Sequence, residues 1–165
     1  MKHTIAILVE DLPGVMARVA SLFTRRGFNI DSIAVGHSET PGISRMTIIV
    51  NGNEKVLEQI MKQLNKLVDV VRVRDIPPEN IIERELVLVR VHVDSLIARS
   101  EIIQLVEIFK AKVAFVERNA ITIEMAGDEE KVNGFLNLVK PFGIREIVRT
   151  GSIAITRNSK NGLRV

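Results

Sequence analysis

The sequence predicts an α+β protein built from two βαββαβ units in tandem. Runs of β-branched residues alternate with segments whose apolar residues recur at helical spacing. The same order of strands and helices occurs in residues 1–76 and again in residues 85–157. In addition, similar segments, Gly52–Lys55 and Gly127–Lys131, open the second helix of each half. Such self-similarity is typical of a duplicated unit.

The ends of the two units are marked by residues that interrupt regular structure. Pro77 and Pro78 block both a helix and a central strand, so residues 77–84 are predicted to be a linker. Residues 158–165 are polar and terminal, and we expect a flexible tail there. The first domain is therefore expected at residues 1–76 and the second at residues 85–157.

The first strand and helix can be placed in detail. A β-branched run predicts a strand over His3–Glu10, and one apolar face predicts a helix over Pro13–Arg26. The apolar residues of that face are Val15, Met16, Val19, Leu22 and Phe23. Gly27 can adopt the left-handed conformation that ends a helix.

The start of this helix is predicted to be open to an anion. If Pro13 is the first helical residue, the preceding cap position is Leu12, whose side chain accepts no hydrogen bond. The backbone amides of Gly14 and Val15 would then be available to a negatively charged group.

Two nearby polar residues extend this hypothesis. Asp11 would attract a cation beside the open amides, and Asn29 offers both a donor and an acceptor at the start of the next strand. An α-amino acid, with a carboxylate and an ammonium on adjacent atoms, would match this set. The alternative is that Asp11 itself caps the helix, Gly14 is only a small residue and Asn29 belongs to a turn.

The remaining elements follow from the same patterns. In the first unit we expect strands at Phe28–His37, Ser44–Asn51 and Val70–Arg74, and a helix at Asn53–Lys66. In the second unit we expect strands at Leu86–Val93, Val113–Glu117, Ala120–Ala126 and Ile144–Arg149, and helices at Ala98–Ala111 and from Gly127 to near Pro141.

A βαββαβ unit most simply forms a ferredoxin-like fold, a four-stranded antiparallel sheet with both helices on one face. In the first strand Ile5, Ile7 and Val9 lie on one face, yet Ala6 and Leu8 make the other face apolar as well. We therefore expect the helix-free face to contact the second half, another copy of the chain or another protein.

Composition excludes several classes of protein. The chain has 165 residues and a net charge of +3. It contains no cysteine, so disulfide and thiolate chemistry are absent. No apolar run approaches the length of a membrane span, and no signal-like segment opens the chain, so we expect a cytoplasmic protein without a membrane partner.

The sequence contains no catalytic or metal-binding motif. His3, His37 and His92 are far apart, and no phosphate-binding glycine motif occurs. An RNA-recognition motif has the same βαββαβ order, but the strands at Ile5–Val9 and Met46–Val50 lack the aromatic residues that stack on bases. We therefore expect no metal and no nucleic-acid partner.

Four segments of the first unit carry a specific resemblance. They are Asp11–Val19, Leu22–Gly36, Ser44–Ile48 and Glu54–Val71. Together they resemble an ACT domain and, more narrowly, the small regulatory subunit of acetolactate (acetohydroxyacid) synthase. The resemblance continues more loosely through the second unit, so that it covers nearly the whole chain.

The resemblance implies a regulatory subunit without catalytic residues. Such subunits form a homodimer through ACT domains, bind a branched-chain amino acid, typically valine, at the dimer interface, and activate and feedback-inhibit a separate catalytic large subunit. The implied effector-binding residues are Asp11, Leu12, Pro13, Gly14 and Val15, with Asn29 and Ile30 from across the interface. Thiamin diphosphate and magnesium would be held by the catalytic partner and not by this chain. The alternative is a free-standing ACT amino-acid sensor that acts on another partner.

Overall fold

The computed structural model describes residues 1–158 and 162–163, and these group into two compact units. The first unit comprises Met1–Ile82 together with Ser152–Val165, as far as the latter segment is described, and the second comprises Glu83–Gly151. This division differs from the predicted one because the C-terminal segment returns to the first unit. Of the predicted tail, residues 159–161 and 164–165 lie outside the described residues.

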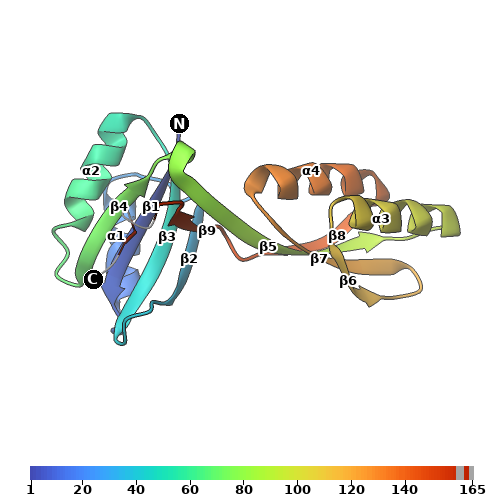
Figure 1. Ribbon diagram of the computed structural model, residues 1–165, viewed down its shortest axis with the longest axis horizontal. Coiled ribbons are helices and arrows are strands. Elements are labelled where there is room, and N and C mark those ends of the chain that lie inside the picture. The colour runs from blue at the N-terminus through green and yellow to red at the C-terminus, as the bar shows by residue number, and fades with distance from the viewer. Residues whose placement is uncertain (159–161, 164–165) are drawn as a thin grey trace. The chain divides into compact units, whose positions relative to one another are not determined.

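The first unit has the predicted βαββαβ order. Its elements are β1 (Lys2–Glu10), α1 (Val15–Arg25), β2 (Ser32–His37), β3 (Ile43–Asn51), α2 (Glu54–Leu64) and β4 (Val70–Ile76). The strands form an antiparallel sheet in the order β2-β3-β1-β4, which is the ferredoxin-like arrangement (Figure 1). The sequence prediction of the fold class is confirmed.

The core of the first unit lies between the sheet and its two helices. Alternate residues of β1 and the inner faces of α1 and α2 supply the buried side chains, among them Ile5, Ile7, Val9, Val15, Val19, Leu22, Phe23, Ile60 and Leu64. The prediction that Met16 belongs to this face is wrong, since its side chain is 43% exposed. Met16 follows Val15 by one residue, about 100° around the helix, and points away from the sheet.

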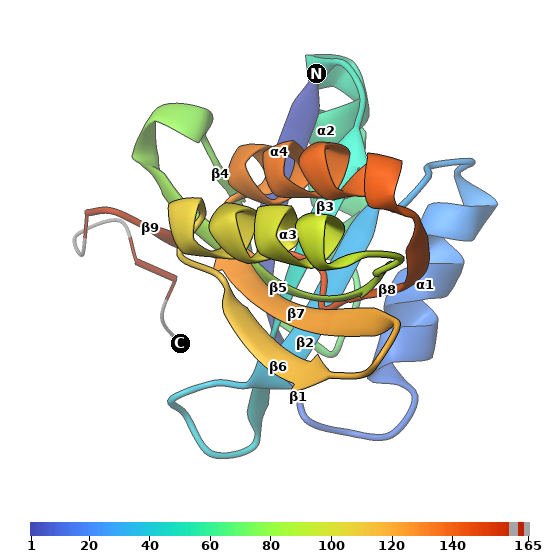
Figure 2. The same cartoon turned by 90° about the vertical axis from the view of Figure 1, so that its right-hand side faces the viewer.

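The second unit repeats the same plan. Its elements are β5 (Ile81–His92), α3 (Leu96–Ile108), β6 (Lys112–Val116), β7 (Ala120–Gly127), α4 (Glu129–Val139) and β8 (Ile144–Arg149), with a short 3₁₀ turn, η2 (Lys140–Phe142), before β8. The strand order is β6-β7-β5-β8, and Figure 2 shows α3 and α4 side by side over this sheet. The buried core includes Val87, Val89, Ile102, Ile123 and Phe135. Ile103, the neighbour of Ile102 on α3, is 39% exposed.

The segment predicted as a linker is largely regular. A 3₁₀ turn, η1 (Pro78–Asn80), is followed directly by β5, which begins five residues before the predicted strand. The prolines therefore end β4 without producing an extended connection, because Pro78 occupies the first position of the turn.

The helix-free face of the first sheet is covered by the chain's own C-terminal segment. A strand absent from the prediction, β9 (Ile153–Thr156), pairs with β5 (Figure 1). Ala154 and Leu163, which are 3% and 5% exposed, pack in one cluster with Ala6, Leu8 and Ile76. Ala154 falls within residues 85–157, the predicted second half, so of the three partners expected for this apolar face the structure places the second half there, through a segment that groups with the first unit.

None of the helices in the described part of the chain combines the length and apolarity that crossing a membrane requires.

Candidate functional site

The candidate site is the loop between β1 and α1, and its geometry follows from a Pro-Gly turn. The amide of Val15 donates to the carbonyl of Leu12 at 3.4 Å, and Gly14 has φ 86° and ψ −9°. Proline at the second position and a positive φ at the third are the features of a type II turn. Pro13 therefore belongs to the turn, and α1 begins at Val15 and not at Pro13 as predicted.

This turn leaves α1 without a side-chain cap. In α2, α3 and α4 the cap residues Asn53, Ser95 and Asp128 each accept a hydrogen bond from the third helical amide, at 3.0, 3.1 and 2.9 Å. In α1 the cap position is Gly14, and among the described residues no side chain accepts a bond from the start of the helix.

The open amides of α1 differ in part from those predicted. The Val15 amide donates within the turn, while Met16 and Ala17, the second and third helical residues, have no acceptor among the described residues for their amides. Both residues are exposed. The positive end of α1 is therefore accessible to an anion, two residues further along the chain than the sequence suggested.

Asp11 does not cap the helix. Its carboxylate accepts a hydrogen bond from the Ser44 hydroxyl at 3.1 Å, and its other oxygen lies 3.3 Å from Nδ1 of His37. Its amide donates to the carbonyl of Gly42 at 2.9 Å. The alternative in which Asp11 is the N-cap is therefore wrong: the residue belongs to the sheet end, with its side chain 45% exposed.

Asn29 and Ile30 lie at the opposite end of the sheet. β2 begins at Ser32, which pairs with Ile49, whereas the loop leaves β1 at Glu10, which pairs with Ile43. Asn29 is exposed and donates to the Asp31 carboxylate at 2.9 Å. One chain therefore brings together Asp11, Leu12, Pro13, Gly14 and Val15, but not Asn29 or Ile30.

Ser44 and His37 are contacts of Asp11 that reasoning from the residues did not assign. Ser44 is 6% exposed and sits opposite Val9 in the register of β1 and β3. The only sequence signal for it was its place in the segment Ser44–Ile48, one of those that carry the family resemblance. Its contact with Asp11 depends on strand pairing across 33 residues, which no local pattern reveals.

The surface next to the open amides carries small side chains and two arginines. A shallow hollow of about 710 Å³ runs along α1 and is lined by Ala17, Arg18, Ala20, Ser21, Thr24 and Arg25. In the part of the chain that the structure describes, no group of three or more His, Asp or Glu side chains could hold a metal ion. The exposed amides of Met16 and Ala17 are complementary to an anion, and the Asp11 carboxylate is complementary to a cation.

The tandem fold and the open helix start after the first strand define an ACT-domain protein. Two family models match the chain: "AHAS small subunit-like ACT domain" over residues 5–72 and "Small subunit of acetolactate synthase" over residues 84–158. The chain belongs to the family of acetolactate synthase small subunits.

Individual relatives agree with this assignment. The chain is 56% identical to a probable acetolactate synthase small subunit of Methanothermobacter thermautotrophicus, over 96% of this chain and 94% of that protein. It is 47% identical to the acetolactate synthase small subunit of Mycolicibacterium smegmatis, over 96% and 92%. The crystal structure of the small subunit from Thermotoga maritima superposes with a TM-score of 0.89 at 49% identity, and covers 96% of this chain and 99% of its own.

Proposed function

We propose that the chain is the non-catalytic regulatory subunit of an acetolactate synthase. In this proposal a homodimer binds valine at the interface of two ACT domains, and the bound valine feedback-inhibits a catalytic large subunit that the regulatory subunit otherwise activates. Thiamin diphosphate and magnesium belong to that catalytic partner, and this chain holds neither.

The observation that carries the proposal is the uncapped start of α1. The amides of Met16 and Ala17 lack acceptors within the described residues, whereas the other three α-helices bind their third amide with a side chain. A carboxylate at such a helix start gains about 0.3–1 kcal/mol when exposed and more when partly buried. The effector's carboxylate is the group that would take these amides.

The separation of the two halves of the site supports a shared interface. Asp11 at the loop has an exposed carboxylate that can reach an ammonium group, but Asn29 and Ile30 of the same chain lie at the other end of the sheet. A second copy, placed with its ACT domain beside the first, would supply the partner subunit's Asn29 and Ile30 to this loop. The site is then complete only in the dimer.

Regulation in this scheme follows from differential binding. Valine favours the dimer geometry in which both halves of the site meet it, and it can shift the catalytic subunit only by its difference in affinity for two states. Such coupling is typically worth about 1–3 kcal/mol, or about 5- to 150-fold in affinity.

Calorimetric titration of the full-length chain with valine, leucine and isoleucine tests the ligand. Co-purification with a thiamin-diphosphate enzyme, followed by activity assays of the reconstituted complex across the same effectors, tests the partner. We expect binding of at least one branched-chain amino acid and inhibition of the complex by it. Absence of binding heat for all three, with the chain folded, would reject the effector; binding without co-purification would instead favour a free-standing sensor.

A further inference from the structure

We propose that the C-terminal segment Ser152–Asn158, the C-terminal strap, transmits effector binding at the loop to the second unit, with Arg45 as its positioning residue. This inference rests on the proposed function, because it needs an effector at Asp11. It is carried by a chain of contacts that starts at the loop, crosses the first sheet and ends where the strap joins the second unit.

The first contact joins the loop to β3. The hydroxyl of Ser44 donates to the Asp11 carboxylate at 3.1 Å. Ser44 is 6% exposed, so its hydroxyl has little access to water as a substitute partner. An ammonium group that binds Asp11 competes with Ser44 for the carboxylate oxygens, and the start of β3 responds directly to the state of the loop.

The second contact joins β3 to the strap. Arg45 follows Ser44 and therefore points to the opposite, helix-free face of the sheet. Its Nη2 donates to the carbonyl of Ala154 at 2.8 Å. Burial lowers the pKa of Arg45 from its ordinary value, and the negative charge of Glu39 opposes this effect. A guanidinium that is partly removed from water depends strongly on the carbonyl that it binds.

The strap is held on this face by packing as well. Ala154 lies in one buried cluster with Ala6 and Leu8, and Leu8 is opposite Arg45 in the register of β1 and β3. Ile153 and Ile155, the neighbours of Ala154, point outward and are 60% and 54% exposed. Ala154 is thus the side chain of this strand that packs on the sheet, and Arg45 adds a hydrogen bond to its carbonyl beside the pairing of β9 with β5.

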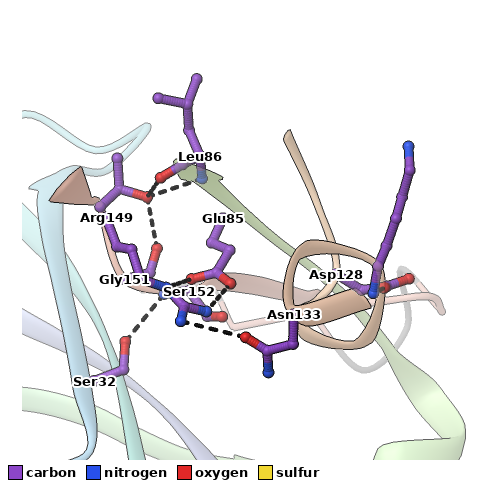
Figure 3. A network of polar contacts seen from close by, with 10 residues as sticks. Ser32, Glu85, Leu86, Asp128, Asn133, Arg149, Gly151 and Ser152 are labelled. Carbon is purple, nitrogen blue, oxygen red and sulfur yellow. Dashed lines mark hydrogen bonds and ion pairs between the residues drawn. The ribbon is translucent and has the colours of Figure 1, made fainter. Parts of the chain in front are cut away.

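Further hydrogen bonds hold the strap within the first unit, among them one from Nε of Arg157 to the carbonyl of Ile81 at 3.0 Å. The Ser152 amide donates to the hydroxyl of Ser32 at 3.0 Å (Figure 3). The Arg157 amide donates to the carbonyl of Asn80 at 3.0 Å. The strap is therefore attached to the first unit near both of its ends.

The chain that enters the strap is fixed in the second unit. Thr150 exchanges two hydrogen bonds with Leu86: its amide donates to the Leu86 carbonyl at 3.1 Å, and its hydroxyl accepts from the Leu86 amide at 3.1 Å. Figure 3 shows the guanidinium of Arg149 between the carboxylate of Glu85, which is 4% exposed, and the side-chain oxygen of Asn133. Only Gly151 lies between this network and the strap. A shift of the strap therefore acts directly on Thr150 and Arg149, which are held by several hydrogen bonds.

Hydrogen–deuterium exchange of the full-length chain, with and without valine, measures the response of the strap. In the wild type we expect valine to change the rate of exchange in peptides that span residues 152–157 by about fivefold or more, the lower end of typical coupling. Calorimetry on the same samples reports binding separately, so that a failed effector site and a failed strap give different results.

Matched variants test the role of Arg45. Arg45→Gln removes the guanidinium that binds Ala154, and Arg72→Gln makes the same change on β4, at a residue that also pairs with Leu8 but has no bond to the strap in the described part of the chain. Valine should bind both variants, while the exchange response of the strap is lost only in Arg45→Gln and returns in Arg45→Lys. If Arg45→Gln does not fold, Ser44→Ala tests the same proposal, because it removes the hydroxyl that joins the loop to β3.

Each outcome is decisive. If valine, leucine and isoleucine all fail to bind, the proposed function and the strap proposal both fall. If valine binds but exchange at residues 152–157 does not change, only the strap proposal is overturned. If the response survives in Arg45→Gln, or in Ser44→Ala where the first does not fold, the route through Arg45 is rejected.

Discussion

The Nε of Arg18 lies 2.5 Å from Oδ2 of Asp69, and this bond ties the first turns of α1 to the turn before β4. The Asp69 side chain is 10% exposed, and that of Arg18 is 50% exposed. The carbonyl of Asp69 also accepts from the amide of Glu10 at 2.9 Å. Asp69 therefore fixes the start of α1 relative to the end of β1. The effector loop connects these two elements.

Replacement of Asp69 by Asn should lower the free energy of unfolding by about 1–2 kcal/mol. A hydrogen bond to a charged group is worth about 1.5–3 kcal/mol, and solvent at the half-exposed Arg18 reduces this value. Urea denaturation measures the change. Glu58→Gln, which breaks the exposed pair of Glu58 with Lys62, is the control and should have a much smaller effect. Equal effects of both variants would contradict the structural role of Asp69.

Hydrophobic periodicity predicted the fold because each unit is built from local patterns. Alternation in β1 separated Ile5 and Ile7 from Ala6 and Leu8, and helical spacing identified Val19 and Leu22 as core residues. β9 was not predicted because it has only four residues, and so short a segment shows little hydrophobic alternation. Their pairing with β5 links positions about 70 residues apart in sequence, and such pairing depends on the folded sheet.

The candidate site was predictable to the extent that it is local. The Leu12-Pro13-Gly14 sequence indicated a helix start without a side-chain cap, and the structure has one. The sequence misplaced the open amides because it did not reveal that Gly14 adopts a positive φ and completes a turn before the helix. The contact of Asp11 with Ser44 could not be predicted, because it requires the register of β1 and β3.

Gly14→Asp should abolish valine binding while the chain still folds. The added carboxylate would lie at the start of α1, where it competes with the effector for the open amides and repels its carboxylate. The residue must also adopt φ 86°, which costs a non-glycine residue about 1–2 kcal/mol. Calorimetry measures binding, and thermal unfolding confirms folding.

Gly143→Asp is the control for loss of stability. Gly143 has φ 96° and ψ 104° in the second unit, outside the left-handed helical region of Gly14, and at both glycines the nearest atom to an added Cβ lies 3.6 Å away. We expect Gly143→Asp to lose at least as much stability as Gly14→Asp, but only Gly14→Asp to lose valine binding. Retained binding in Gly14→Asp would exclude the start of α1 as the effector site.

Asn29→Ala should weaken valine binding by about ten- to a hundredfold, the equivalent of one hydrogen bond to a charged group. In the proposed dimer this side chain contacts the effector held by the other copy, and in the free chain it is oriented by its bond to Asp31. Asn65→Ala is the control, because Asn65 is an exposed residue of the same unit whose side-chain amide donates to the carbonyl of Met61. Equal affinity of the two variants would remove Asn29 from the site.

Asp75→Asn should stabilise the protein relative to the wild type, and this difference should grow as the pH rises from 3.8 through the raised pKa of Asp75. Burial raises the pKa of the Asp75 carboxyl above its ordinary value of 3.8; the charge of His3 opposes this shift and that of Glu79 adds to it. Since the folded state binds the proton more tightly than the unfolded state, Asp75 makes the free energy of unfolding fall as the pH passes from 3.8 through the raised pKa. Asn does not ionise, so the variant lacks this loss. Urea denaturation between about pH 4 and pH 7 should show the two curves separating with pH. Parallel curves for Asp75→Asn and the wild type would show that burial does not disfavour this carboxylate.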